Sequence, residues 1–192
     1  MSSSLASVLT SDDLPAAELQ AVLLDGDVYP LAGAYCLIGE LETPRHRARA
    51  VLGGRSPRLI AELHTAAWIW GATDHLARLR FAVSPDARTR LPPGAGHVLR
   101  EIVHSPGDVA TLDGLSVTTP LRTILDLVRA ETPEPGTPGI VARLAAIGAL
   151  TLADCRADLE ARVGIPSRLA VADRLERAFA EGVGPGQPVD TR

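Results

Sequence analysis

The chain has 192 residues, of which 46% are hydrophobic, and its formal net charge at pH 7 is −4. A chain of this length and composition can bury a core as one ordinary domain or two small ones, which excludes a fully disordered protein. Its apolar runs are shorter than a membrane span and its first residues lack the pattern of a signal peptide, so we expect a soluble cytoplasmic protein without membrane contact.

The first part of the chain is strongly acidic. Residues 1–44 contain seven Asp and Glu residues and neither Arg nor Lys, whereas the rest of the chain holds 16 acidic residues and all 19 Arg. Leu and Val at helical spacing predict a helix over residues 15–24, and residues 28–37 predict a tight β-ribbon that turns at Gly33. We therefore expect residues 1–43 to form a reduced, winged-helix-like segment.

A short Arg-rich helix is expected at the boundary. Thr43 has the residue type of a helix cap and a proline follows it, which predicts a helix over residues 44–52. This helix carries two candidate partner-binding residues, Arg45 and Arg49. They lie either on a solvated linker or in a patch that pairs with carboxylates or phosphates, and the sequence leaves both interpretations open.

The next segment predicts a helix and a small sheet. Ser56 and Pro57 again have the types of a cap and a first helical residue, and the helix that they predict ends at Gly71. Its apolar stripe consists of Ile60, Leu63, Ala67 and Trp70. A loop over residues 84–96 separates the first of four expected strands from the others, and the strands cover residues 79–83, 98–103, 109–112 and 115–118. We expect these strands to form a small, mainly antiparallel sheet backed by helices.

Residues 113–127 form the most informative segment of the chain. A short half-buried strand leads directly into a helix for which Thr119 is the expected cap and Pro120 the first residue. The apolar residues of this helix share one face, and the pattern places its charged residues on the opposite, solvent-exposed face. Those charged residues are Arg122, Asp126 and Arg129.

The C-terminal part is expected to be helical. A Pro- and Gly-rich linker is predicted over residues 131–139, and a disordered tail over residues 182–192. Three helices are predicted between them, over residues 140–149, 151–163 and 166–181, and the last would bury Leu169, Ala172, Leu175 and Phe179. The fold class is therefore α+β, with a winged-helix-like segment over residues 1–43, an α+β domain with a helical C-terminal part over residues 44–181, and the tail.

Two motifs resemble those of actinobacterial AbiEi-type antitoxins, the protein half of type IV toxin–antitoxin pairs. Residues 113–127 are similar to the signature "pvTsp.RTllDL" of this family, and residues 61–71 are similar to the helix that precedes it. The resemblance covers residues 8–128. In the family, an Arg-rich winged helix-turn-helix occupies the N-terminal region. This chain departs from that pattern, because Asp25 and Asp27 stand where the family commonly has basic residues.

The resemblance implies an antitoxin that binds and neutralises a cognate nucleotidyltransferase-like toxin. It also implies an alternative, a DNA-binding repressor of the toxin–antitoxin operon. Duplex binding depends on Arg and Lys that neutralise phosphates, so the acidic N-terminal segment opposes the alternative. If the segment does not bind DNA, the winged helix persists only as a scaffold or as a docking face for a basic protein. A third interpretation is a structural or nuclease-related remnant.

We expect neither an enzyme nor a cofactor-binding protein. The sequence lacks the phosphate-binding loop of nucleotide-binding enzymes and the serine motif of hydrolases, and its five His residues show no metal-ligand spacing. Cys36 and Cys155 stand far apart without a CxxC pattern, so no disulfide or thiolate site is indicated. No metal and no small-molecule ligand are therefore expected.

The five candidate partner-binding residues are Arg122, Asp126, Arg129, Arg45 and Arg49. Three roles are open for Arg122. It forms an exposed pair with Asp126 one turn away, or fastens Thr118 or the turn at residues 113–114, or acts as an anchor in the toxin interface. We favour a structural role, because a signature at a strand-to-helix junction is explained by the fold itself.

Overall fold

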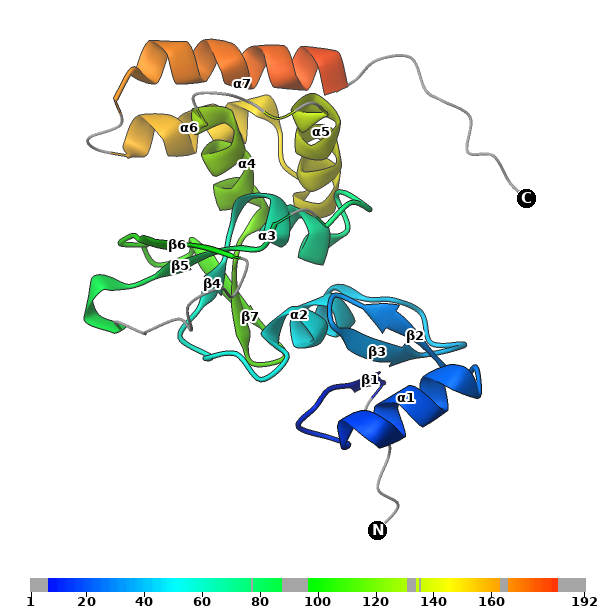
Figure 1. Cartoon of the computed structure of the whole chain (residues 1–192). Helices are drawn as coiled ribbons and strands as arrows, with labels where there is room; N and C mark the ends of the chain where they lie inside the picture. Colours follow the sequence, from blue (N-terminus) through cyan, green and yellow to red (C-terminus); the bar gives the residue numbers. More distant parts are fainter. Residues whose placement is uncertain are drawn as a thin grey trace.

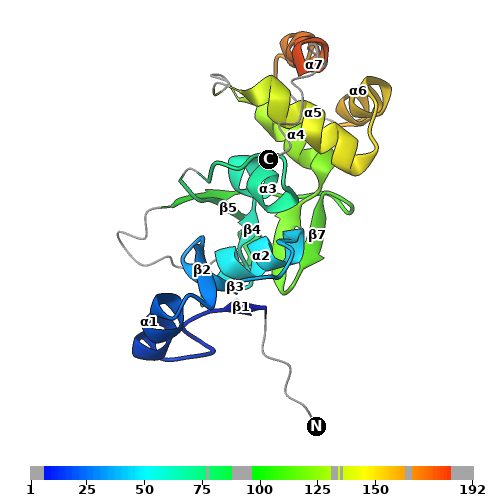
Figure 2. The same cartoon turned by 90° about the vertical axis from the view of Figure 1, so that its right-hand side faces the viewer.

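The computed structural model describes residues 7–76, 78–87, 97–130, 134, 136–162 and 166–182. It has an α+β fold in three layers: a small N-terminal sheet with one helix, a five-stranded sheet, and a helical layer (Figure 1). A quarter turn of the molecule keeps the helical layer and the N-terminal segment on opposite sides of the five-stranded sheet (Figure 2). The α+β class predicted from the sequence is confirmed.

The N-terminal segment is a three-stranded antiparallel sheet with one helix. Its elements are β1 (Val8–Leu9), α1 (Ala16–Leu24), β2 (Val28–Leu31) and β3 (Ala34–Leu37), and the strand order is β1-β3-β2. Ala32 and Gly33 join β2 to β3 with φ values of 51° and 89°, a left-handed pair that suits a two-residue hairpin turn. The expected helix and β-ribbon are thus confirmed, while the designation of this segment as a winged helix stays a prediction.

Helix α2 (Pro44–Leu52) connects this segment to the rest of the molecule. The Nε atom of Arg49 donates a hydrogen bond of 2.9 Å to the carbonyl of Val8, and its Nη2 atom lies 2.8 Å from a carboxylate oxygen of Asp13. Arg47 pairs with Glu42 and stacks over the ring of Trp68. Of the two candidate residues on this helix, Arg45 is exposed, whereas Arg49 ties the N-terminal segment to α2.

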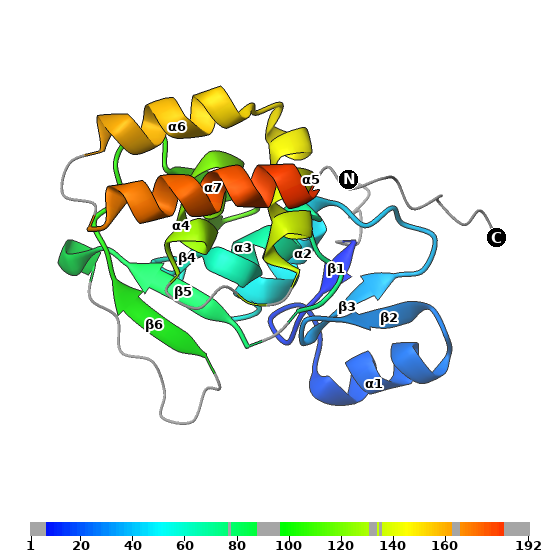
Figure 3. The same ribbon diagram turned by 90° about the horizontal axis from the view of Figure 1, so that it is seen from above.

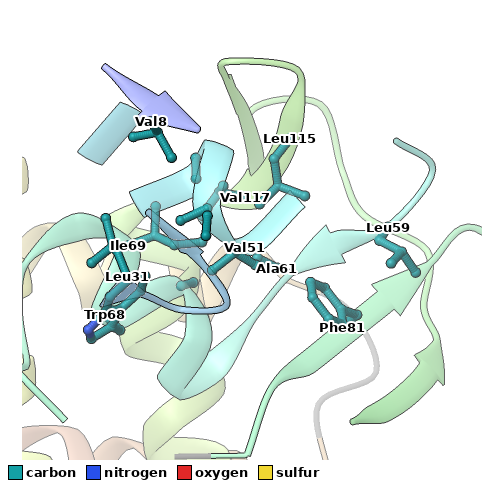
Figure 4. Packing of buried hydrophobic residues seen from close by; sticks show 14 of the residues in the cluster. Val8, Leu31, Val51, Leu59, Ala61, Trp68, Ile69, Phe81, Leu115 and Val117 are labelled. Atoms are coloured by element: carbon teal, nitrogen blue, oxygen red, sulfur yellow. The ribbon is translucent and has the colours of Figure 1, made fainter. Parts of the chain in front are cut away.

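One hydrophobic core runs across the boundary at residue 43. Apolar side chains of the N-terminal sheet pack together with those of α2, α3 and the five-stranded sheet (Figure 4). Its members on the two sides of the boundary include Val8, Leu31 and Cys36, and Val51, Phe81 and Val117. The N-terminal segment therefore shares its burial with the rest of the molecule, and the division into two units stays a prediction.

The second sheet has mixed pairing. Its strands are β4 (Ile60–Ala61), β5 (Arg80–Val83), β6 (Val98–Glu101), β7 (Val109–Leu112) and β8 (Leu115–Thr118), in the order β6-β5-β4-β8-β7. Pairs β4–β5 and β7–β8 are antiparallel, whereas β4–β8 and β5–β6 are parallel. A short 3-10 helix, Pro85–Ala87, follows β5, and the loop over residues 88–96 lies outside the described residues.

Strand β4 corrects the prediction that a helix begins at Pro57. Ile60 and Ala61 form the central strand, hydrogen-bonded on both sides, and helix α3 (Leu63–Trp70) begins only after them. A short apolar run has the same signature in a buried strand as in a buried helix, so periodicity alone cannot separate the two. Trp70 at the end of α3 donates its indole N–H to the carbonyl of Thr118 at 2.8 Å, which fixes α3 against β8.

Four helices form the layer above the sheet: α4 (Pro120–Arg129), α5 (Thr137–Gly148), α6 (Leu152–Ala161) and α7 (Arg168–Gly182) (Figure 3). They enclose a second hydrophobic core with α3. The expected caps are confirmed, since the hydroxyls of Thr119 and Thr151 accept from the backbone N–H groups of Arg122 and Asp154.

Three details of this layer differ from the sequence-based expectation. Helix α5 begins at Thr137, so the last residues of the predicted linker are helical. Leu169 is 84% exposed, because the buried face of α7 is formed by Val171, Ala178 and the expected Leu175. Gly182 still belongs to α7, and the rest of the predicted tail lies outside the described residues.

No single helix in the described ranges is long and apolar enough to cross a membrane. Among the described helices, the pair α5 and α6 reaches that length and composition when taken together, but it is bent by 93° at its junction.

Candidate functional site

An arginine-lined cleft lies where the edge of the five-stranded sheet meets α4 and the end of α6. Its volume is about 530 Å³, a size typical of binding sites. Five Arg side chains from β5, β6, α4 and the residue after α6 line it: Arg80, Arg100, Arg122, Arg129 and Arg162. The other lining residues are Leu63, Ile102, Val103, Asp126 and Ala130. Three of the five candidate residues, those on α4, therefore meet in one cleft.

Arg122 and Asp126 line the cleft and are buried. The two residues are only 6% and 7% exposed, which corrects the expectation that they lie on a solvated helix face. The Nε atom of Arg122 donates to Asp126 at 2.9 Å, and its Nη1 atom donates to Asp108 at 2.7 Å. The strand-side partner of Arg122 is thus Asp108 in the loop before β7, and not Thr118 or the turn at residues 113–114.

Asp108 is the common acceptor of this network. Both Nη atoms of Arg162 donate to its carboxylate, at 2.5 and 3.1 Å, and the N–H of Ser105 donates at 2.9 Å. Burial alone would raise the pKa of Asp108, but the hydrogen bonds from Arg162 and Ser105 and the charge of Arg122 outweigh it and hold the pKa at about 2. The carboxylate raises the pKa of Arg162 in turn.

The network joins three segments that are distant in the chain. Asp108 precedes β7, Arg122 lies on the first turn of α4, and Arg162 caps the end of α6, where it also pairs with Asp158 at 2.7 Å. Breaking one partner of a buried ion pair leaves a desolvated charge, which costs about 3–5 kcal/mol. The network therefore holds the helical layer on the sheet.

A second buried pair supports the wall formed by β6. Glu62 is fully buried before α3, and it accepts two hydrogen bonds of 2.7 Å from the Nε and Nη2 atoms of Arg100. This bidentate pairing raises the pKa of Arg100. Because the Arg100 side chain remains 43% exposed, the Glu62 carboxylate fixes a guanidinium that still faces the cleft.

Arg129 differs from the other lining guanidinium groups. It lies one turn beyond Asp126, is half-buried, and makes no ion pair with any described residue. Arg80 lies 3.5 Å from a carboxylate oxygen of Glu134, a loose ion pair. Of the candidate residues in the cleft, Arg129 is therefore the one without an ion pair to a described residue, while Arg122 and Asp126 pair with each other.

His104 lies beside this network. Both of its ring nitrogens are buried without a hydrogen-bond partner in the described part of the chain. Burial and the charge of Arg122 lower its pKa, so the neutral form is favoured. Within the described ranges, no group of three His, Cys, Asp or Glu side chains is placed to hold a metal ion. Both Cys36 and Cys155 are free and buried.

Sequence reasoning missed four residues of this site. Asp108, Glu62, Arg100 and Arg162 carry no local signal of the ion pairs that they form across the site, since those partners lie 14 to 54 residues away along the chain. Whether the five candidate residues contact a partner stays a prediction. The structure brings Arg122, Asp126 and Arg129 together and leaves Arg45 and Arg49 on α2.

Comparisons with known proteins show that this site lies within the match to a known domain family. The model of the AbiEi antitoxin C-terminal domain matches residues 59–164, a region that runs from β4 through α6 and includes the whole network. The crystal structure of the RV2827C protein from Mycobacterium tuberculosis is similar over 93% of this chain and 73% of that chain, with 18% sequence identity and a TM-score of 0.45. A comparison with curated proteins found no match.

Replacing Arg122 tests the structural role of the network. We expect Arg122→Ala to lower the free energy of unfolding by about 3–5 kcal/mol, because Asp126 and part of Asp108 lose their buried partner. Arg129→Ala, a neighbouring Arg in the same cleft, should change it by less than about 1 kcal/mol. Urea denaturation followed by circular dichroism measures both. Equal stabilities of the two variants would contradict the role that we assign to Arg122.

Acid titration tests the charge on Asp108. Its folded pKa lies below the ordinary value of 3.8, so its contribution to stability is fully present above pH 4 and is lost as the pH falls towards 2. A pKa lowered from 3.8 to about 2 corresponds to about 2 kcal/mol. The difference in unfolding free energy between the wild type and Asp108→Asn should therefore shrink by that amount between pH 5 and 2. A difference that stays constant over this range would show that the carboxylate is not held ionised by the network.

Proposed function

This chain belongs to the AbiEi antitoxin family, and we propose that it neutralises a cognate nucleotidyltransferase-like toxin by binding that protein directly. The observation that carries this proposal is the family match over residues 59–164, which covers both the arginine-lined cleft and the network beneath it. An antitoxin that acts by binding needs a stable surface and does not need to catalyse a reaction. The buried pairs supply the rigidity that such a surface requires.

Within the cleft, we assign the toxin contact to Arg129. Its guanidinium has no partner among the described residues, so a toxin carboxylate gains a hydrogen-bonded pair there without breaking an existing one. Val103, which also lines the cleft, is 78% exposed and adds apolar area beside it. Arg is one of the residue types enriched among the few residues that dominate interface energies. Arg122 and Asp126 act by holding α4 in place.

A DNA-binding repressor is the second candidate function. The order of strands and helix in the N-terminal segment favours it, because a helix followed by a hairpin is the arrangement of a reading helix and a wing. The charge opposes it, because residues 7–43 contain no Arg or Lys and the end of α1 carries the exposed Asp25 and Asp27. We therefore expect no promoter-selective binding in a gel-shift titration at physiological salt. Nanomolar, selective binding would establish the repressor function instead.

Co-expression with the product of the adjacent gene tests the antitoxin function. We expect relief of growth arrest and a complex that elutes as one species on gel filtration. Arg129→Glu should weaken the complex at least tenfold, since the new carboxylate repels the toxin carboxylate that the guanidinium would bind. Arg177→Glu, an exposed Arg on α7 outside the cleft, is the matched control and should leave the affinity within about twofold. Separate elution together with continued arrest would refute the proposed function.

A further inference from the structure

Three exposed apolar side chains gather at one end of the N-terminal segment. Leu24, Ile38 and Leu41 are 85%, 61% and 83% exposed, and they are half of the large apolar side chains that are strongly exposed among the described residues. Leu24 ends α1, and the other two follow β3. A hydrogen bond of 2.9 Å from the N–H of Ile38 to the carbonyl of Asp27 joins these two segments. Both segments lie at the end of the sheet that points away from α7 (Figure 3).

Unpaired carboxylates alternate with these apolar residues. Asp25, Asp27 and Glu40 are exposed and form no ion pair with any described residue. The acidic residues nearer to α2 behave differently, because Asp13 and Glu42 are paired with Arg49 and Arg47. We call the set Leu24, Asp25, Asp27, Ile38, Glu40 and Leu41 the acidic–apolar surface.

The backbone of this surface is fixed by turns. Gly26 and Gly39 adopt φ values of 79° and 92°, which favour glycine. The N–H of Asp25 donates to the carbonyl of Ala21 at 2.9 Å, and the N–H of Glu40 donates to that of Leu37 at 3.4 Å. An ordered surface loses little conformational entropy on binding, so its exposed Leu and Ile side chains are available for association at low cost.

The chemistry of the surface selects a basic partner that also offers apolar contacts. A nucleotidyltransferase binds a nucleoside triphosphate and transfers a nucleotidyl group from it. Its substrate groove therefore has to present cationic groups to the phosphates. We propose that the acidic–apolar surface occupies this groove of the toxin, with the carboxylates of Asp25, Asp27 and Glu40 in the place of substrate phosphates. This inference rests on the proposed function, and it specifies inhibition by steric block of the substrate groove.

Other occupants fit the surface less well. Duplex DNA carries the same sign of charge and is repelled. A second copy of the chain would have to offer a basic face, but most of the guanidinium groups in its arginine-lined cleft are already paired with Glu62, Asp108 and Asp126. A basic groove on another protein is therefore the complementary partner.

A triple variant tests the surface directly. We expect Leu24→Ser/Asp25→Asn/Asp27→Asn to weaken the affinity for the purified toxin at least 100-fold in isothermal titration calorimetry, and to flatten its dependence on salt concentration. The matched control on α7 is Leu169→Ser/Asp173→Asn/Glu181→Gln, which changes an equally exposed Leu and two exposed acids and should remain within threefold of the wild type. Circular dichroism melting verifies that both variants fold.

The outcomes separate this inference from the proposed function. If the wild type does not bind the toxin, the proposed function fails and the inference fails with it. If the wild type binds and the triple variant binds equally well, only the inference fails. A free protein that is dimeric on gel filtration, and becomes monomeric in the triple variant, would assign the surface to a second copy and overturn the inference.

Competition with heparin, a polyanion, tests the location on the toxin. We expect free toxin to be retained on immobilised heparin, and we expect the wild-type antitoxin to release it while the triple variant does not. A toxin that heparin does not retain, or a wild-type complex that is retained as tightly as free toxin, would show that the acidic–apolar surface does not occupy a basic groove.

Discussion

The structure of the antitoxin domain depends on one buried ionic network. Asp108 accepts hydrogen bonds from Arg122 and Arg162 in a place where its side chain is only 4% exposed, and Arg122 also binds Asp126. Desolvation of these charges is costly, and only the close geometry of several simultaneous hydrogen bonds offsets it. The network joins the loop before β7 to α4 and to the end of α6, so it sets how the helical layer sits on the sheet.

The same network determines which surfaces remain for recognition. Arg122 and Asp126 belong to the segment most similar to the AbiEi signature, yet both side chains are buried and paired inside the protein. Arg129 and the carboxylates at the end of α1 form no ion pair with any described residue, and we propose that these groups face the partner. These groups have opposite signs and lie in different layers of the molecule, which is consistent with a toxin that is contacted by both parts of the chain.

Local structure was predictable where neighbouring residues determine it. The cap and proline at Thr119 and Pro120, the hairpin turn at Gly33 and the cap at Thr151 act within a few residues, so their side chains and backbone preferences are visible in the sequence. The limits of β7 and β8 followed from alternation between turn residues. Strand β4 was missed because two residues are too few to show a period, and it is defined only by partners from distant segments.

The candidate site was predictable only in part, for a related reason. Helical periodicity placed Arg122, Asp126 and Arg129 on one face correctly, but it assigns a polar face to solvent whether or not another element covers it. The covering residues, Asp108 and Arg162, are 14 and 40 positions from Arg122, and no pattern links them. Leu169 shows the opposite error, since an apolar residue at helical spacing was assigned to the core although α7 turns it outward.

A double-mutant cycle between Asp108 and Arg122 tests most directly whether the network is one energetic unit. Unfolding free energies of Asp108→Asn, Arg122→Ala and the double variant are compared with that of the wild type at neutral pH. We expect the double variant to be less destabilised than the sum of the single variants by about 1.5–3 kcal/mol, because each single change already removes the shared interaction. Additivity within about 0.5 kcal/mol would contradict the central role that we assign to this buried network.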